Sequence, residues 1–322
     1  MSVVLDLFFT LVGLAVLVAG GEGMVRGAAG LSRRLGISPT VIGLTVVAFG
    51  TSAPELAVNV AAALRAGEIS FGNIVGSNLA NIGLGIGLAA CLRPLSIRSV
   101  VVDREIPMML LATAAAFVAA LDPYLSGSPP LYGRTEGVLL LLFFGVFIYY
   151  NLFEVLRNRT EVLASAEEVP GGALSVPLAL LLFGAGVGGL VGGAEITVRY
   201  AVRLAFALGL PKSFIGFTLI ALGTSLPEIA TSLVAVRRGE TDLLIGNIVG
   251  SNIFNLLFIL GITASIRPVP VPRQGFSDLL MVTVLSVVLF LISLRGTIRR
   301  REGVFFLALY LLYLTFKTFT LP

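Results

Sequence analysis

The amino-acid sequence predicts an all-α integral membrane protein in which ten transmembrane helices form two inverted five-helix repeats. Of the 322 residues, 57% are hydrophobic and only 12% are charged, and the mean hydropathy is +1.00, which is not the composition of a soluble domain. Apolar runs of about 18 residues or more, long enough to span a bilayer, recur along the chain. In addition, the two halves of the sequence repeat each other.

The apolar runs set the order and the extents of the expected helices. In the first half they lie at 3–25, 38–64, 70–91, 106–121 and 136–156, and in the second half at 174–198, 213–236, 242–264, 277–294 and 303–319. The first run is expected to be retained as a helix, because the first arginine, Arg26, follows the run, whereas a signal peptide has its basic residues before the apolar stretch.

Basic residues are divided unequally between the two sets of loops that alternate along ten spans. The richer set includes the segments around Arg33, Arg98 and Arg300. Loops rich in lysine and arginine remain in the cytoplasm, so we expect this set to be cytoplasmic and both termini to be extracellular. Anionic lipid and this rule account for the net charge of +4, and no nucleic-acid partner is expected.

Two signatures carry the internal repeat. GLTVVAFGTSAPE at 43–55 matches GFTLIALGTSLPE at 216–228, and each is followed by the heptapeptide GNIVGSN, at 72–78 and at 246–252. Each half holds five predicted spans, an odd number, so the second half enters the membrane with the opposite polarity. Inverted repeats of this kind are typical of secondary transporters, whose substrate site lies near the midplane where the halves meet.

The repeat also divides the chain into domains. The first transmembrane repeat is expected at 1–156 and the second at 174–322, and the polar stretch 157–173 joins them as a cytoplasmic linker.

A glutamate lies within an apolar segment of each signature. Glu55 and Glu228 would each cost roughly 2.5 to 3.5 kcal/mol to insert as ions, so such residues normally face a partner, a cavity or an ion. Gly50 and Pro54 predict a broken helix in which the carbonyls from Ala48 to Gly50 lose their helical partners. Broken helices at this depth are tolerated where they line a cavity or bind an ion.

The polar residues near the two glutamates supply only oxygen ligands. Thr51 and Glu55 are four residues apart and point the same way on a helix, as do Ser77 and Asn81. The second half repeats this pattern with Thr224, Ser225, Glu228, Ser251 and Asn255. Histidine is absent, and oxygen ligands select hard cations such as Ca²⁺. Two ionised glutamates would balance one Ca²⁺ or two Na⁺.

At these residues the chain resembles the sodium/calcium exchanger family of the cation/calcium exchanger superfamily, in its compact prokaryotic form. The regions 43–94 and 216–268 look like the family's two alpha repeats. The resemblance implies an antiporter in which Na⁺ and Ca²⁺ compete for overlapping sites by alternating access, electrogenically, in the cell membrane. It also implies no cofactor, no enzymatic activity and no obligate protein partner besides the two ions and membrane lipid.

The family's ion-binding residues carry over by motif position. They fall on Ala48, Thr51, Ser52, Glu55, Ser77 and Asn81 in the first half and on Ala221, Thr224, Ser225, Glu228, Ser251 and Asn255 in the second, where the two alanines would act through their carbonyls. Several relatives, including the potassium-dependent branch, have aspartate in place of Asn255. With asparagine at this position, the site of this chain has one carboxylate fewer than the site of those relatives. This difference implies exchange that does not depend on K⁺.

Other functions remain as alternatives. A proton/calcium exchanger would use a buried glutamate to carry protons, but proton-coupled relatives typically have Gly-Asn-Ala before this glutamate, where this chain has Gly-Thr-Ser. An intramembrane hydrolase that uses Ser52 or Ser225 would need a lysine partner, and Lys212 and Lys317 lie at predicted helix ends. An ion channel fits poorly with an inverted repeat that meets at a closed site.

The remaining polar and small residues are expected to be structural. Glu22 and Glu195 each precede an arginine by four residues, which predicts ion pairs at helix ends. Loop or helix-end positions are expected for Asp122, Glu136, Asp242 and Asp278, and a core position for the single cysteine, Cys91. Close helix packing is expected at Gly72, Gly76, Gly246 and Gly250.

Overall fold

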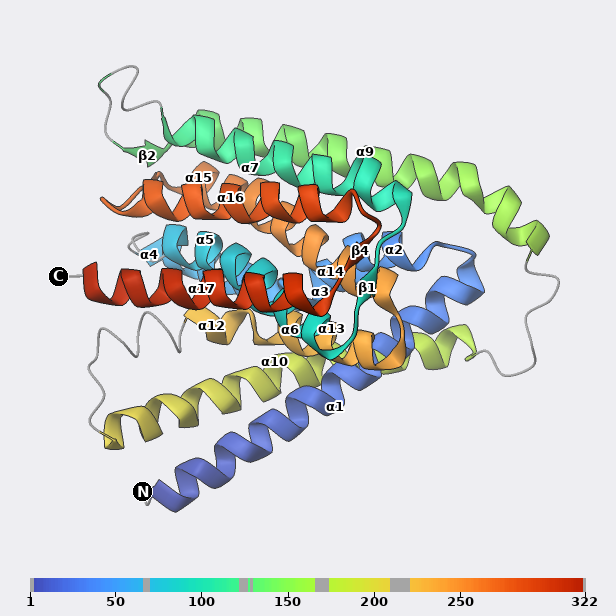
Figure 1. The fold of residues 1–322 in the computed structure, drawn as a ribbon, viewed down its shortest axis with the longest axis horizontal. Coiled ribbons are helices and arrows are strands. Elements are labelled where there is room, and N and C mark those ends of the chain that lie inside the picture. Colours follow the sequence, from blue (N-terminus) through green and yellow to red (C-terminus); the bar gives the residue numbers. More distant parts are fainter. Residues whose placement is uncertain are drawn as a thin grey trace.

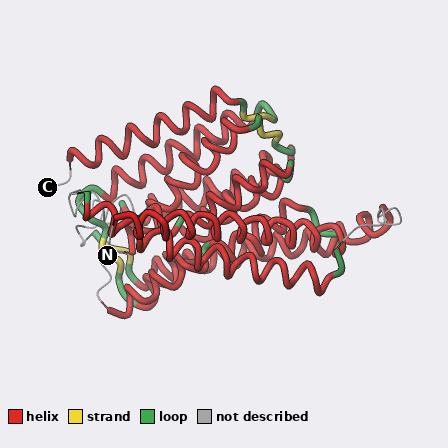
Figure 2. The backbone as a smooth tube through the Cα atoms, turned by 90° about the horizontal axis from the view of Figure 1, so that it is seen from below, coloured by secondary structure: helices red, strands yellow, loops and turns green. Residues whose placement is uncertain are grey.

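The protein is a bundle of long helices. The computed structural model describes residues 3–65, 70–121, 127, 130–165, 174–208 and 221–320. Nearly all of these residues are helical, and the loops lie at the ends of the bundle (Figure 2).

The helices of the first half follow the order of its apolar runs. They are α1 (Val3–Leu35), the series α2 (Pro39–Ile42), η1 (Gly43–Val47), α3 (Ala48–Thr51) and α4 (Ala53–Arg65), the series α5 (Ser70–Ala80), η2 (Asn81–Ile86) and α6 (Gly87–Leu92), the pair η3 (Val101–Glu105) and α7 (Ile106–Ala120), and α9 (Arg134–Ser165).

The second half has the same order of elements. They are α10 (Val176–Ala207), the pair α12 (Ala221–Thr224) and α13 (Leu226–Arg238), the series α14 (Thr241–Ile253), η6 (Phe254–Ile259) and α15 (Leu260–Ile266), α16 (Gly275–Ser293) and α17 (Arg300–Thr320).

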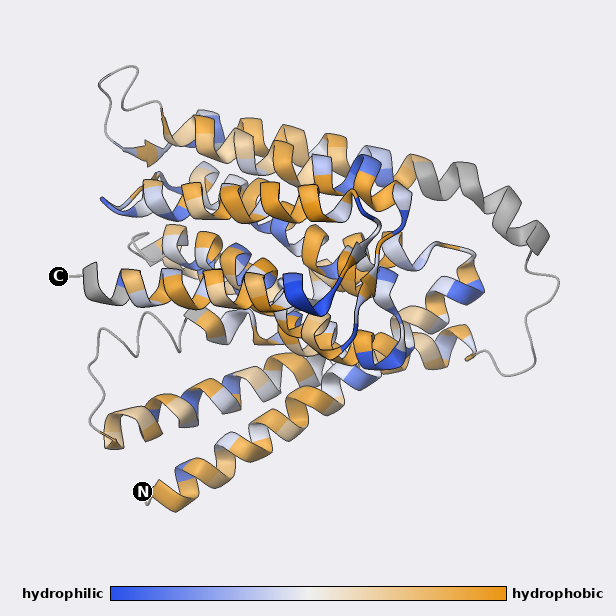
Figure 3. Ribbon diagram, viewed as in Figure 1, coloured by the Kyte–Doolittle hydropathy of each residue, from blue (hydrophilic) through white to orange (hydrophobic). Residues whose placement is uncertain are grey.

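Within the described ranges, six helices are long and apolar enough to cross a membrane, and a seventh span results if α2–α3 and α4, which are bent by 47° at their junction, count as one. Hydrophobic residues dominate the helices along most of their length (Figure 3), and large apolar side chains such as Phe8, Leu142 and Leu312 are exposed on the outer helices. Exposure of this kind suits lipid. The chain is therefore a multi-pass helical membrane protein.

Several helices extend beyond their predicted ends. Helix α1 continues to Leu35, α10 continues to Ala207, and α9 continues to Ser165, inside the stretch predicted as the linker. Hydropathy locates the apolar part of a helix and does not determine the residues at which the helix begins and ends.

Helices α1 and α10 lie side by side at the edge of the bundle (Figure 1). Glycines allow this contact. A Cβ atom on Gly20 would lie 2.5 Å from the backbone nitrogen of Leu190, and one on Gly27 would lie 2.5 Å from that of Phe183. The two backbones therefore touch directly, as in small-residue helix pairs in membranes.

Within the residues that the structure describes, two short antiparallel ribbons connect the halves. β1 (Leu95–Ser96) pairs with β4 (Thr297–Ile298), and β2 (Leu131–Tyr132) pairs with β3 (Val269–Pro270). β1 and β2 belong to the first half and lie toward opposite ends of the bundle (Figure 1). Each ribbon thus takes one strand from each half.

Glycine packing agrees with the prediction in the second half. A Cβ atom on Gly246 would lie 2.5 Å from the carbonyl oxygen of Thr40, and one on Gly250 would lie 2.5 Å from that of Leu44. No described residue lies within 4 Å of a Cβ placed on Gly72 or Gly76. The repeat equivalents of Thr40 and Leu44 fall in 213–217, which lies outside the described residues, so close packing of the first pair stays a prediction.

Candidate cation site

Two helix breaks with the same geometry place the signature residues. Helix α3 ends at Thr51 and α4 begins at Ala53, and the residue between them, Ser52, has φ −86° and ψ 6°. In the second half α12 ends at Thr224 and α13 begins at Leu226, and Ser225 has φ −84° and ψ −1°. A proline in the first turn of a helix is tolerated, because its missing N–H has no partner there. The repeated Pro therefore starts a new helix directly after each Thr-Ser pair.

The break frees only part of the expected set of carbonyls, which ran from Ala48 to Gly50. Ala48 keeps its helical partner, since its carbonyl accepts from the Ser52 amide at 3.0 Å and lies 3.3 Å from Thr51 Oγ1. Pro54 has no N–H, so the carbonyl four residues before it, that of Gly50, loses its usual donor. The prediction of a freed carbonyl at Ala48 is therefore wrong. In the second half the Ser225 amide donates to the carbonyl of Leu222 at 3.1 Å, and Ala221 is described only as the first residue of α12.

Both signature glutamates are buried in the first turns of their helices. Glu55 and Glu228 are each 1% exposed, and the positive end of a helix dipole favours an anion there. Their charges are close enough to interact, and the hydroxyls of Thr224 and Ser77 lie near Glu55. The two halves thus meet at a pair of buried carboxyl groups.

Hydroxyl groups connect the first signature to the second half. Ser52 donates to Glu228 Oε1 at 2.7 Å, and its oxygen lies 3.1 Å from that of Ser251. Thr51 Oγ1 lies 3.2 Å from Asn247 Oδ1. All five side chains are buried, so this network is sealed inside the bundle.

Asparagines that we did not predict as site residues complete the network. Asn247 contacts Thr51, and its repeat equivalent Asn73 donates to Thr224 at 3.0 Å. Asn73 in turn accepts from the buried Asn59 at 2.7 Å. Both Asn73 and Asn247 are the second residue of GNIVGSN. The signal in the sequence was a polar residue, repeated in both copies, within an otherwise apolar helix.

The predicted ligands Asn81 and Asn255 bond across the two halves. Asn81 donates to Asn252 Oδ1 and Asn255 donates to Asn78 Oδ1, both at 3.0 Å. Both lie in π-helical segments, since Asn81 begins η2 and Asn255 is the second residue of η6. π-helical turns often occur at functional sites.

Several buried oxygens of the predicted ligands have no hydrogen-bond partner among the described residues. They are both carboxylate oxygens of Glu55, Oε2 of Glu228, Oγ of Ser77 and Ser225, and Oδ1 of Asn81 and Asn255. Buried polar atoms are almost always paired, so each exception calls for an explanation. A cation supplies that partner for an oxygen, and hard cations such as Ca²⁺ and Na⁺ match this donor set.

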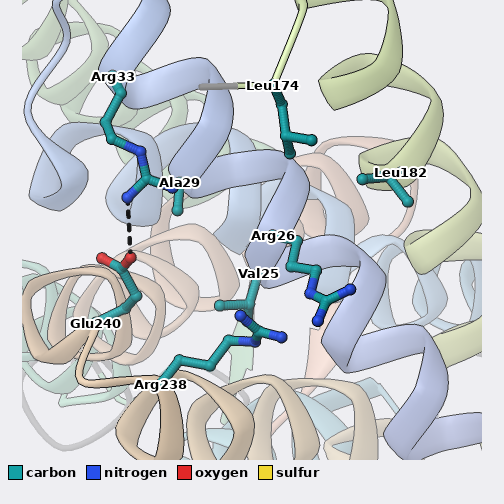
Figure 4. Close-up of a pocket in the computed structure, with 8 residues that line it drawn as sticks. All are labelled: Val25, Arg26, Ala29, Arg33, Leu174, Leu182, Arg238 and Glu240. Atoms are coloured by element: carbon teal, nitrogen blue, oxygen red, sulfur yellow. Dashed lines mark hydrogen bonds and ion pairs between the residues drawn. The ribbon is translucent and has the colours of Figure 1, made fainter. Parts of the chain in front are cut away.

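Other charges form ion pairs outside this network. Glu22 pairs with Arg26 at 3.3 Å and with Arg238, and Glu195 pairs with Arg199 at 2.6 Å. The predicted pairs therefore exist, but they lie inside the long helices α1 and α10 and not at helix ends. Arg26, Arg33, Arg238 and Glu240 line a hollow of about 240 Å³ between α1, α10 and α13 (Figure 4).

Loop or helix-end positions were predicted for four further acidic residues, and three of them lie in the described ranges at such positions. Glu136 accepts from the Gly133 amide at the start of α9, and Asp242 pairs with Arg98 at 3.3 Å in the first turn of α14. Asp278, in the first turn of α16, is buried and pairs with Lys317. Asp122 lies outside the described residues.

A family model decides the relationship of the chain to known proteins. The model described as "sodium/calcium exchanger protein" matches residues 5–153 and 178–319. The chain belongs to the sodium/calcium exchanger family. The prediction from the two signatures is therefore confirmed.

Individual relatives of the family match nearly full length. The inner membrane protein YrbG of Escherichia coli is 36% identical over 300 residues, which cover 91% of this chain and 90% of that protein. The sodium/calcium exchanger MaX1 of Methanosarcina acetivorans is 33% identical over 97% of this chain and 98% of that protein. A solved structure of the sodium-calcium exchanger NCX_Mj superposes with a TM-score of 0.82, at 32% identity, and covers 98% of this chain and 100% of that one.

Proposed function

We propose that this protein is a secondary active antiporter that exchanges Na⁺ for Ca²⁺ by alternating access. The observation that carries the proposal is the pair of buried glutamates, Glu55 and Glu228, on matched broken helices, with three of their four oxygens lacking a hydrogen bond among the described residues. Ionised, they balance one Ca²⁺, which takes about 6 to 8 oxygens in flexible geometry. The hydroxyl and amide oxygens beside them supply the remaining ligands.

The same groups explain competition between the two ions. Two Na⁺ neutralise the carboxylates as well as one Ca²⁺ does, so loading with one ion excludes the other. A further Na⁺ bound at hydroxyl and carbonyl oxygens would leave the loaded site positive, and the cycle would then be electrogenic. Asn255 adds no charge, and we therefore propose exchange that is independent of K⁺.

Alternating access requires that one part of the molecule moves against the rest. We assign this movement to α1 and α10, the repeat-related pair that packs together as one unit through glycine contacts between their backbones.

In this proposal ten spans form two inverted repeats, at 1–156 and 174–322, both termini are extracellular, and no cofactor or obligate protein partner takes part.

Calcium binding to the purified protein tests the site. Ca²⁺ should raise the unfolding temperature of the wild-type protein in detergent, because a ligand that binds only the folded state stabilises it. Glu55→Gln and Glu228→Gln should each abolish this rise, and Glu302→Gln, at the start of α17 and far from the signatures in sequence, should retain it. A Ca²⁺-dependent rise that persists in both signature variants would contradict the proposed site.

Proton exchange is the second candidate, and a pH gradient distinguishes it. The Gly-Thr-Ser sequence before each glutamate weighs against proton exchange, since proton-coupled relatives typically have Gly-Asn-Ala at this place.

A further inference from the structure

Asn78 and Asn252 form a symmetric pair at the ends of the two GNIVGSN segments. They lie on α5 and α14, and both are buried, at 0% and 1% exposure. Neither was predicted as a ligand. Each instead accepts a hydrogen bond from a predicted ligand of the other half, as Asn255 donates to Asn78 and Asn81 donates to Asn252, both at 3.0 Å.

These bonds determine which end of each ligand amide is available. A side-chain amide has an NH₂ group at one end and a carbonyl oxygen at the other. The nitrogens of Asn81 and Asn255 are used by the cross-repeat bonds, and their oxygens are buried without a hydrogen-bond partner in the described part of the chain. The oxygen, which attracts a cation, is thus the free end.

The accepting amides are oriented in turn by their own donor groups. Asn78 Nδ2 donates to the main-chain carbonyl of Asn252 at 3.2 Å, and Asn252 Nδ2 lies 3.6 Å from Met109 Sδ. With their nitrogens directed elsewhere, both residues present Oδ1 to the ligand amide of the opposite half. The Asn–Asn bonds match on both sides of the repeat, although the two nitrogens contact different groups.

We propose that Asn78 and Asn252 are positioning residues, which hold the amides of Asn255 and Asn81 with oxygen rather than nitrogen toward the transported cation. The proposal rests on the proposed function of the site. Without the acceptor, the ligand amide can rotate by half a turn and present N–H groups, which repel a cation. Groups that orient metal ligands typically contribute 10- to 100-fold to metal affinity.

A double-mutant cycle separates positioning from a general structural role. Equilibrium binding of ⁴⁵Ca²⁺ to the purified full chain is measured for the wild type, Asn78→Leu, Asn255→Leu and the double variant. Each single change should weaken Ca²⁺ affinity about 10-fold. If Asn78 acts through Asn255, the double variant should bind within about twofold of Asn255→Leu, because coupled residues are not additive.

The matched control pairs Asn78 with Asn81, which lies one helical turn away on the same side of the repeat but donates its bond to Asn252. Here the two losses should multiply, to about 100-fold. A loss of about 100-fold in the Asn78 and Asn255 double variant would overturn the proposal. If Asn78→Leu does not fold, the equivalent cycle of Asn252 and Asn81 provides the same test.

Failure of the positioning proposal is distinguishable from failure of the proposed function. The cycle measures Ca²⁺ affinity alone and does not depend on the coupling ion. Uptake driven by protons would therefore overturn sodium coupling and leave the cycle valid. Additive losses in a protein that exchanges Na⁺ for Ca²⁺ would overturn positioning alone, and a wild-type protein without Ca²⁺ binding would overturn both.

Discussion

Glu55 and Glu228 occupy equivalent positions in the repeat but have different surroundings. Ser52 donates to Glu228, whereas the equivalent serine, Ser225, and both oxygens of Glu55 have no hydrogen bond among the described residues. The conformation described here is therefore asymmetric at the site. If the protein works by the proposed alternating access between inverted repeats, a change of access state should exchange these two environments.

This asymmetry predicts different effects for the two serines. Ser52→Ala removes the donor to Glu228 and leaves a buried acceptor unpaired, which should lower the free energy of unfolding of the cation-free protein by about 1–3 kcal/mol. Ser225→Ala is the matched control and should cost less, because its hydroxyl makes no such bond. Thermal unfolding in cation-free detergent measures both. Equal losses would contradict the asymmetric hydrogen bonding.

At the residue scale, the sequence located the two buried glutamates but not the contacts around them. Glu55 and Glu228 could be recognised because a repeated charge in an apolar segment is costly. Asn73, Asn78, Asn247 and Asn252 were missed, because a lone asparagine within a membrane helix is also compatible with simple helix packing. Their roles depend on bonds between residues more than 140 positions apart in sequence, and no local pattern specifies these.

At the scale of elements, the broken helices were predicted and their geometry was not. The Gly-Thr-Ser-x-Pro sequence indicated a break, but hydropathy could not show that it falls at Ser52 and Ser225 or that the bend in the first half is 47°. The π-helical segments η2 and η6 were not foreseen either, since apolar periodicity does not distinguish them from α-helix over one turn.

The contact between α1 and α10 provides a prediction at this scale. Gly186→Val should disrupt it, because a Cβ atom on Gly186 would lie 2.3 Å from the backbone nitrogen of Met24. Gly184→Val is the control on the same helix, since no described atom lies within 4 Å of its Cβ position. Ca²⁺ uptake and monodispersity on size-exclusion chromatography should fall for the first variant and stay near wild type for the second. Equal tolerance of both would argue against a tight α1–α10 interface.

At the scale of the whole molecule, the distribution of arginines predicts the orientation in the membrane. Ser96 in β1 and Ser277 at the start of α16 are both exposed, and the ribbons nearest to them in sequence, β1–β4 and β2–β3, lie toward opposite ends of the bundle. The loop of Ser96 belongs to the arginine-rich set. It should therefore face the cytoplasm, and Ser277 should face outward.

Single cysteines test this orientation. In a Cys91→Ser background, Ser277→Cys should react with a membrane-impermeant maleimide in intact cells, and Ser96→Cys should react only after permeabilisation. The opposite pattern would place both termini in the cytoplasm and would contradict the arginine-based assignment.

The sequence predicted those features of the architecture that depend on composition and on the internal repeat. Apolar runs located the helices and the two signatures located the repeat, but the ends of α1, α9 and α10 lie beyond the apolar runs. The tertiary contacts that join the halves, from the β-ribbons to the Glu22–Arg238 pair, depend on side chains that come together only in the folded bundle.

The measurement that tests the central claim most directly is ⁴⁵Ca²⁺ uptake into proteoliposomes. Vesicles loaded with Na⁺ are compared with vesicles loaded with K⁺ and with vesicles that carry only a pH gradient, each for the wild type, Glu55→Gln and Glu228→Gln. Uptake driven by outward Na⁺, unchanged by added K⁺ and lost in both variants, is the result predicted for sodium/calcium exchange at the paired carboxylates. Uptake that follows the pH gradient, or that persists in the variants, would contradict it.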